Sequence, residues 1–368
     1  MRRISTKLAW SCAAVLVLIL GGFAPAWGQN PRLGPEKPAF TLGTEEMARE
    51  LTSIAREHLR AKNYEKAYKV LKQLVFLKPD DATLHFQLGQ TYIKLGRCQD
   101  AVKAFKQAIL FKADFAAAHL GLGGAYILLD RPEDAIEVIN RGLRFQEDKV
   151  EGHILLGSAH LLLKNYTEAA AAYLRAAQLN SRSAEAQLGL GQAYNYLGKY
   201  QDAVAALTEA VRLNPQNSGA YLELAAAYSN LGLYEKGLEA CREALRRQPD
   251  WPEVHYGLGV FYACTGQYTD AVLAYKLATR LKPDFYQAFT GLGEALTQLD
   301  RYEDAVDAFQ TAIRIQPDYA RAHFSLGCSY LRQGAKTGAL EEYEILSTMD
   351  LHLARTLYHY IAQDFMPR

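Results

Sequence analysis

The sequence predicts an all-α fold, a solenoid of stacked helical hairpins, on the strength of three observations. A Gly-Leu-Gly run returns at residues 121, 189, 257 and 291, at intervals of 68, 68 and 34 residues. From Ala48 to Leu353 the chain divides into nine windows of 34 residues, with no insertion or deletion. Each window carries two stretches whose apolar residues recur at helical spacing. A phosphate-binding glycine loop has no reason to recur on a fixed period, so the glycines indicate a structural repeat.

Each window predicts two helices. Places four, seven, eight and eleven fall on one face of a first helix, and places twenty, twenty-four and twenty-seven on one face of a second. Glycine fills place eight in most windows, and we expect it to let the two helix backbones of a hairpin approach closely. The windows start at Ala48, Ala82, Ala116, Val150, Ala184, Ser218, Pro252, Tyr286 and Ala320.

The ends of the helices also have sequence signals. Glycines between the two helices can adopt the left-handed conformation that ends a helix. Prolines close several windows before the next one begins. The glycines are Gly96, Gly198, Gly232, Gly266 and Gly334, and the prolines are Pro79, Pro215, Pro249, Pro283 and Pro317.

The order Leu-Gly-x-x-Tyr, then Ala, then Phe or Tyr, then Ala and Pro resembles the tetratricopeptide repeat, over residues 48–353. The resemblance implies a right-handed superhelix of helix-turn-helix repeats, with a concave groove that holds an extended peptide or a partner helix. The third and fourth windows depart from it, with Glu147 and Ser181 in place of the closing proline. Residues 354–368 are expected to supply a capping helix, because Leu353, Leu357 and Ile361 continue an apolar stripe through residues 350–363.

Residues 1–28 are expected to be a secretory signal peptide. Arg2, Arg3 and Lys7 precede an uncharged apolar stretch from Leu8 to Phe23, and small residues follow it. Cleavage is expected after Ala26 or Gly28, which makes the protein periplasmic or secreted. An uncleaved membrane anchor is the alternative. Residues 29–47 read as a flexible linker and a helix start, with Thr44 as the capping residue.

The composition argues against several functions. Lys and Arg total 41 against 40 for Asp and Glu, so no nucleic-acid partner is expected, and a membrane contact only through the uncleaved segment. No catalytic motif or metal-spaced Cys and His cluster occurs, so we expect no enzyme activity, no cofactor and no metal. The cysteines after the signal read as apolar core residues, although Cys241 and Cys264 are close enough in sequence to pair. They are Cys98, Cys241, Cys264 and Cys328.

Histidine recurs at the fourth place of five windows. A metal ladder is one interpretation, but equivalent helices in neighbouring repeats are too far apart for tight coordination. We therefore expect these side chains to pack at the helix starts. They are His85, His119, His153, His255 and His323.

The function expected from these features is that of an exported, non-enzymatic scaffold that binds a partner protein in its groove. An accessory subunit of an envelope enzyme or secretion complex, and a self-associating scaffold, are the alternatives. The expected groove residues occupy places of the first helices outside the core pattern, and its middle is apolar. They are Phe86, Gln87, Gln90, Lys94, Leu120, Ile127, Leu128, Ile154, Leu155, Ser158, Leu161, Leu162, Leu188, Gln192, Asn195, Tyr196, Leu222, Glu223 and Asn230, with Ser229, Thr290, Glu294 and Gln298 further along.

Overall fold

A computed structural model describes residues 42–363, which form a continuous series of α-helices with no strand among them. The expected signal peptide, most of the linker and the last five residues of the expected cap lie outside the described residues. The chain divides into two compact units, Met1–Lys199 and Tyr200–Arg368, so the boundary falls inside the fifth window. No helix within residues 42–363 has both the length and the hydropathy needed to cross a membrane.

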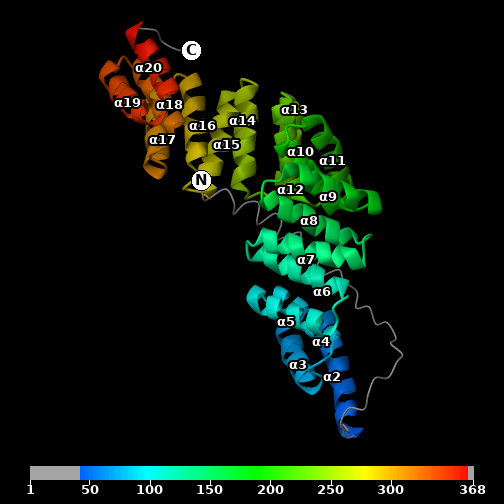
Figure 1. Ribbon diagram of the computed structural model, residues 1–368. Coiled ribbons are helices and arrows are strands. Elements are labelled where there is room, and N and C mark those ends of the chain that lie inside the picture. The colour runs from blue at the N-terminus through cyan, green and yellow to red at the C-terminus, as the bar shows by residue number, and fades with distance from the viewer. Residues whose placement is uncertain (1–41, 364–368) are drawn as a thin grey trace. The chain divides into compact units, whose positions relative to one another are not determined.

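The first unit contains the first four hairpins and the first helix of the fifth. Successive helices pack against each other in chain order (Figure 1). The first helix of this unit begins at Leu42, so Thr44 lies inside it and the prediction of Thr44 as the helix cap is wrong. The helices are α2 (Leu42–Arg60), α3 (Tyr64–Leu77), α4 (Ala82–Lys94), α5 (Cys98–Phe111), α6 (Ala116–Leu128), α7 (Pro132–Phe145), α8 (Val150–Leu162), α9 (Tyr166–Leu179) and α10 (Ala184–Tyr196).

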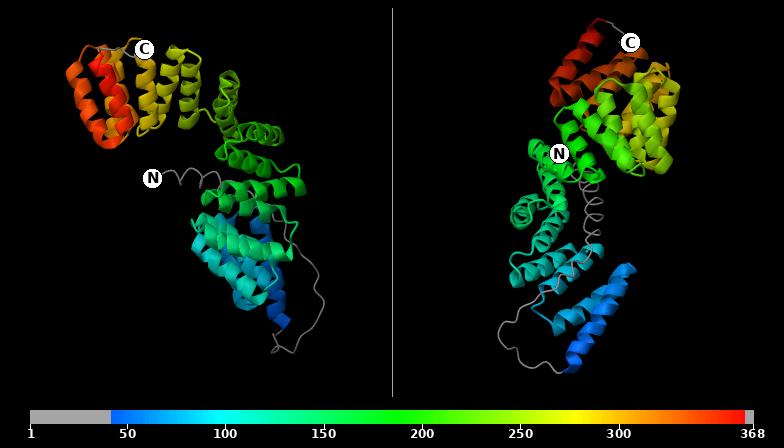
Figure 2. Two further views of the ribbon diagram at one scale, coloured as in Figure 1. Left: turned by 45° about the horizontal axis from the view of Figure 1, so that its top comes forward. Right: turned by 90° about the vertical axis from the view of Figure 1, so that its right-hand side faces the viewer.

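The second unit contains the second helix of the fifth window, four further hairpins and a closing helix (Figure 2). From α4 onward, every first helix begins at the residue that opens its window. The helices are α11 (Tyr200–Leu213), α12 (Ser218–Asn230), α13 (Tyr234–Arg247), α14 (Pro252–Cys264), α15 (Tyr268–Leu281), α16 (Tyr286–Gln298), α17 (Tyr302–Ile315), α18 (Ala320–Arg332), α19 (Lys336–Met349) and α20 (Leu351–Ala362).

The first helices end at a left-handed residue, as the glycines predict. Gly96 has a φ of 72°. The amide of the next residue, Arg97, donates to the Tyr92 carbonyl at 2.9 Å, which is the 6→1 hydrogen bond of a Schellman motif. Four repeats have no glycine here and still adopt the same conformation: Lys62, Asp130, Lys164 and Asp300 have φ between 55° and 60°. The bonds of the turn therefore impose this conformation even where a side chain makes it costly.

The glycines of the first helices make room for aromatic rings from the second helices. Phe105, at place twenty-four of the second repeat, is fully buried. A Cβ added at Gly89, in the same repeat, would lie 2.7 Å from its ring, and a Cβ at Gly121, in the next repeat, would also lie 2.7 Å away. The space above these glycines therefore holds a ring. Close backbone approach is seen as well, since a Cβ added at Gly123 would lie 3.4 Å from the backbone oxygen of Ala135.

The same arrangement recurs in both units. The ring of Tyr173 lies against Gly157 and Gly189, and the ring of Tyr275 lies against Gly259 and Gly291. In each pair, the first glycine is at place eight of the ring's own repeat and the second is at place six of the next. The two glycines of a Gly-Leu-Gly run thus leave two spaces on one first helix, each filled by a side chain from a different second helix.

Place six is small wherever the preceding ring is large. After Phe105, Tyr173, Tyr275 and Phe309 it holds Gly121, Gly189, Gly291 and Ser325. After the smaller Leu71 and Ile139 it holds Gln87 and Leu155. This size matching is what close packing between neighbouring repeats requires.

The sixth repeat varies the arrangement. Gly237 stands at place twenty, where all other repeats have alanine, and a Cβ there would lie 2.3 Å from the ring of Phe261. Phe261 in turn occupies a place where other repeats have a small residue such as Ala125 or Ala295. The unusual glycine therefore matches an unusual phenylalanine in the next repeat.

The closing helix covers the last hairpin. Helix α20 packs against α18 and α19, and Leu357 fills the slot above Gly327, 2.6 Å from an added Cβ. Leu357 and Ile361 are buried, as their stripe predicts, and α20 falls within residues 350–363, where the stripe runs. The Asp350 carboxylate accepts from the amides of His352 and Leu353 and so fixes its start.

Gly237→Ala tests the ring slots directly. It introduces the alanine found in the other repeats and improves helix propensity by up to about 1 kcal/mol. We nevertheless expect it to lower the free energy of unfolding by about 1–3 kcal/mol, because the Phe261 ring occupies the space. The control is Gly257→Ala, where the added Cβ meets only Cys241 Sγ, at 3.3 Å. Urea unfolding followed by circular dichroism measures both, and equal effects would contradict the slot.

Candidate partner-binding face

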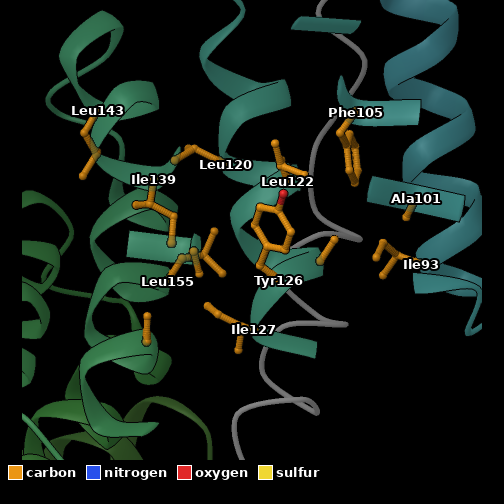
Figure 3. Packing of buried hydrophobic residues seen from close by; sticks show 13 residues of the cluster. Ile93, Ala101, Phe105, Leu120, Leu122, Tyr126, Ile127, Ile139, Leu143 and Leu155 are labelled. Carbon is orange, nitrogen blue, oxygen red and sulfur yellow. The ribbon is translucent and has the colours of Figure 1, made fainter. Parts of the chain in front are cut away.

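Many of the expected groove residues are core residues. Leu120, Leu155 and Leu161 are 0% exposed, and Leu120, Ile127 and Leu155 lie within one packed cluster with Phe105 and Ile139 (Figure 3). First helices lie between the second helices of two repeats, so these side chains face the interior. The expectation that they line a binding surface is wrong for the buried set: Leu120, Ile127, Ile154, Leu155, Ser158, Leu161, Leu188, Gln192 and Thr290.

The half-buried apolar members also serve packing. Phe86 lies 5.8 Å from the ring of Phe105 and 5.0 Å from that of Phe115, measured between centroids. Leu128 and Leu162 pack against the cluster of Figure 3, and Leu222 packs against a cluster of the second unit. The expected apolar middle of the groove is therefore the edge of the core.

The remaining members are mostly polar and lie at the surface or half-buried. Tyr196 is exposed and stacks on Tyr166, with 4.7 Å between ring centroids. Burial lowers the pKa of the Lys94 amine, and the charge of Lys62 adds to the effect. The others are Gln87, Gln90, Asn195, Glu223, Ser229, Asn230 and Gln298. These residues remain predicted partner contacts.

The second unit carries a more distinctive cluster, here called the tyrosine face. It comes from three consecutive first helices and the turn before the last of them. Arg321 on α18 holds Glu294 on α16 in a two-pronged ion pair, with Nε to Oε1 at 2.7 Å and Nη2 to Oε2 at 2.8 Å. The members are Tyr256 on α14, Tyr286 and Glu294 on α16, Tyr319 at the start of α18, and Arg321.

The tyrosine rings are held in place by packing. Tyr256 lies 5.1 Å from the ring of Phe285 and 5.8 Å from that of Tyr275, and Tyr286 meets the Tyr319 ring edge-on at 4.9 Å. All three rings of the face are half-buried, which leaves part of each accessible. The Arg321 side chain is 62% exposed, so the ion pair lies at the surface beside them.

The surroundings favour the neutral form of two of the phenols and the charged form of Arg321. Burial raises the pKa values of Tyr256 and Tyr319 above 10.0, with Glu294 adding to the rise and Arg321 opposing it. The hydrogen bond to Glu294 raises the pKa of Arg321. The face therefore offers hydroxyl groups, aromatic surface and one ion pair fixed by two hydrogen bonds.

Sequence reasoning found only Glu294 of this face. The other members fall at unrelated places of the repeat: Tyr256 at place five, Tyr286 at place one, Tyr319 at place thirty-four and Arg321 at place two. Arg321 reaches Glu294 because places two and nine of adjacent first helices lie side by side. A search for opposite charges at those two places of neighbouring windows could have found the pair.

Two acidic residues lie at helix starts, and three of the four described cysteines are buried or half-buried. Asp134 and Asp304 lie in the first turns of α7 and α17, and each accepts from an arginine three residues earlier, at 2.8 Å. Cys98, Cys241, Cys264 and Cys328 are unpaired, and burial raises the pKa of the Cys241 thiol to about 12. Cys264 is exposed, so its assignment to the core is wrong.

The histidines at place four form one recurring bond. The Nε2 atom of each lies 2.8–2.9 Å from the carbonyl oxygen six residues earlier, which belongs to the preceding turn. Among the described residues, no three His, Cys, Asp or Glu side chains converge as metal ligands would. The expected packing at helix starts is confirmed, and the bond ties each repeat to the one before.

His323 differs from the other four. Its Nε2 bonds the Pro317 carbonyl, and its Nδ1 lies 2.6 Å from the Glu342 carboxylate, with both side chains buried. The bond to Glu342 raises the pKa of His323 above 6.5, against the effect of burial. Acceptors at both nitrogens favour the protonated form of the ring over the neutral form.

Leu155→Ala and Gln87→Ala distinguish core from surface at one place of the repeat, since both residues are at place six. Loss of the fully buried Leu155 side chain is expected to lower the free energy of unfolding by about 2–5 kcal/mol. Gln87→Ala is expected to stay within about 0.5 kcal/mol of the parent. Urea unfolding measures both, and a small effect at Leu155 would return it to the candidate surface.

The His323–Glu342 pair predicts a pH dependence of stability. A pKa raised by folding contributes stability fully below the unfolded value of 6.5, and loses it as the pH rises through the folded value. The melting temperature of the parent should therefore fall from about pH 6.5 upward relative to that of Glu342→Gln. Parallel curves for the two proteins would contradict the charged pair.

Comparison with known proteins agrees with the fold. Models of the tetratricopeptide repeat match residues 52–109, 86–149, 143–185, 154–218, 196–259 and 252–285, and a TPR repeat model matches residues 293–334. No curated protein matches the chain.

Several solved structures are similar to it. A tetratricopeptide repeat protein from Parabacteroides merdae ATCC 43184 is 17% identical, over 68% of this chain and 99% of that one, with a TM-score of 0.53. The APC/C hetero-tetramer Cut9–Hcn1 is 14% identical over 87% of each chain, with a TM-score of 0.52. YrrB, a TPR protein with an unusual peptide-binding site, is 22% identical over 51% of this chain and 96% of that one, with a TM-score of 0.44. Repeated family matches along most of its length show that the chain belongs to the tetratricopeptide repeat family.

Proposed function

We propose that this protein is an exported, non-enzymatic scaffold that binds a partner protein, with the tyrosine face as its main contact. Proteins of this family bind protein or peptide partners through surfaces of the repeat stack. The observation that carries the assignment is the two-pronged Arg321–Glu294 pair set among three half-buried tyrosines.

The composition of this face suits a protein interface. Tyrosine and arginine are enriched at the energetic centres of interfaces, because they offer large contact area together with polar groups. Packing already restricts the Tyr256 and Tyr286 rings, so little conformational freedom remains to be lost on binding. The fitting partner is a peptide or helix that covers the rings with apolar side chains and meets Arg321 and Glu294 with polar groups.

Export rests on the N-terminal sequence alone. A positive start, an apolar stretch and small residues precede the repeats within residues 1–28. Cleavage after Ala26 or Gly28 leaves a chain that includes every described residue. N-terminal sequencing of the protein from its native source tests this, since a chain that still begins at Met1 would rule out cleavage and favour the anchored form.

A capture experiment with matched variants tests the partner site. The bait is residues 29–368, and the test bait carries Tyr319→Ala and Arg321→Ala. The control bait carries Lys149→Ala and Glu151→Ala, which occupy the same two places in the repeat, but in the first unit. Loss of the surface ion pair costs about 0–1 kcal/mol, and loss of the half-buried Tyr319 ring adds to that cost, so thermal melting must first show that all three baits are folded at the capture temperature.

The expected result is a protein captured from a cell-envelope extract by the parent and the control, and depleted at least about tenfold by the test bait, which is a loss of about 1.4 kcal/mol. If the test bait retains every protein that the parent captures, the tyrosine face is not the site. Detection of hydrolase or transferase activity in the purified chain would contradict the non-enzymatic assignment.

A further inference from the structure

A second surface of different chemistry lies on the second helices of the first two repeats. Helices α3 and α5 both pack against α4 (Figure 1) and present side chains at places twenty-two, twenty-five and twenty-nine. In both repeats the first two places are lysine and the third is a large apolar residue. This basic apolar patch consists of Lys69, Lys72 and Phe76 on α3, and Lys103, Lys106 and Leu110 on α5.

The apolar side chains of the patch are unusually exposed. Phe76 is 85% exposed and Leu110 is 71% exposed, the two highest values among the large apolar residues at the surface of the described chain. The other aromatic residues at this end of the repeat behave differently, because Phe111 stacks on His85 and Phe145 lies against His119. Packing within the chain therefore does not account for Phe76 and Leu110.

The same places carry different residues in other repeats. The third repeat has Glu137, Asn140 and Arg144, and the eighth has Asp307, Gln310 and Arg314. Arginine fills place twenty-nine in most repeats, so a charged, soluble side chain is the ordinary choice there. The combination of two lysines with a protruding apolar residue is specific to the first two repeats.

The charges of the lysines remain at the surface. Lys72 Nζ lies over the Tyr68 ring, 5.7 Å from its centroid, and Lys106 Nζ lies over the Tyr126 ring at 5.9 Å, while all four lysines are exposed. Lys103 makes a long contact of 3.8 Å with Asp100, and its side chain is 81% exposed. The four ammonium groups are thus available to a negatively charged surface.

We infer that the basic apolar patch docks the protein on an anionic lipid bilayer. Lysine stems lie along apolar surface while their charges reach the headgroups, and a protruding Phe or Leu enters the boundary between headgroups and acyl chains. Anionic lipids attract each lysine near the surface. Protein interfaces, by contrast, concentrate their binding energy in side chains seated in well-packed pockets, whereas Phe76 stands clear of its neighbours.

The position of the patch along the sequence also favours a lipid bilayer as its partner. The two repeats that carry it are the first after the apolar stretch from Leu8 to Phe23, and residues 24–41 separate that stretch from α2. If that stretch stays uncleaved in a membrane, a short tether holds the patch near the bilayer. If it is removed, the patch supplies the membrane contact by itself. The inference is independent of the tyrosine face, which lies in the other unit.

Vesicle binding tests the docking. The protein is residues 29–368, because residues 42–363 make all the contacts described here, and circular dichroism confirms that each variant is folded. The probes are phosphatidylcholine vesicles and vesicles of equimolar phosphatidylcholine and phosphatidylglycerol. We expect binding only to the second, weakened by salt, and reduced at least about tenfold by Phe76→Ser with Leu110→Ser, or by Gln at the four lysines.

The matched control is Arg280→Ser with Arg314→Ser, at place twenty-nine of the seventh and eighth repeats, which should bind like the parent. Phe76→Trp should show a blue-shifted emission on the anionic vesicles, and Arg280→Trp should not. Failure to bind the anionic vesicles would overturn the inference. Loss of binding in the lysine variant alone, with Phe76→Ser and Leu110→Ser unaffected, would also overturn it, because any polyanion could then replace the bilayer.

Discussion

The stacking of this chain depends on one constraint, that a large side chain at place twenty-four of a second helix must fit between two first helices. Phe105, Tyr173 and Tyr275 each meet two glycines, one in their own repeat and one in the next. Those two contacts fix the spacing within a hairpin and the spacing between hairpins together. The size of one side chain in one repeat therefore determines what the next repeat can carry. Phe261 and Gly237 satisfy the same constraint from other places, and Leu357 satisfies it at the end of the stack.

Much of this fold could be predicted from the sequence, because its signals are local and repeated. Helical spacing, left-handed glycines and closing prolines each act within one window, and nine windows repeat the evidence. The meaning of the glycines could not be read in the same way. Gly121 and Gly291 look like helix contacts within one window, and only the adjacent repeat shows which ring they accommodate. The prediction of Thr44 as a helix cap failed because α2 already begins at Leu42.

The expected groove was predicted less well, also for a physical reason. Apolar residues such as Leu155 and Ile154 fall outside the core pattern of a single hairpin, so they look available for a partner. In the stack, the neighbouring second helices bury them. Burial between repeats depends on the sizes of side chains in two windows, as Ile139 and Leu155 illustrate, and periodicity within one window carries no such information. The tyrosine face was missed for the same reason, because Arg321 and Glu294 come from different repeats.

The ring of Tyr275 fills the space that a side chain at Gly291 would need, so the two positions should be energetically coupled. A double-mutant cycle measures this coupling most directly. Gly291→Ala, Tyr275→Leu and the double variant are compared by urea unfolding. We predict that the alanine is destabilising beside the tyrosine and nearly neutral beside the leucine, with a coupling of about 1–3 kcal/mol. Additive effects of the two substitutions would contradict the claim that the ring and the glycine together set the spacing of the repeats.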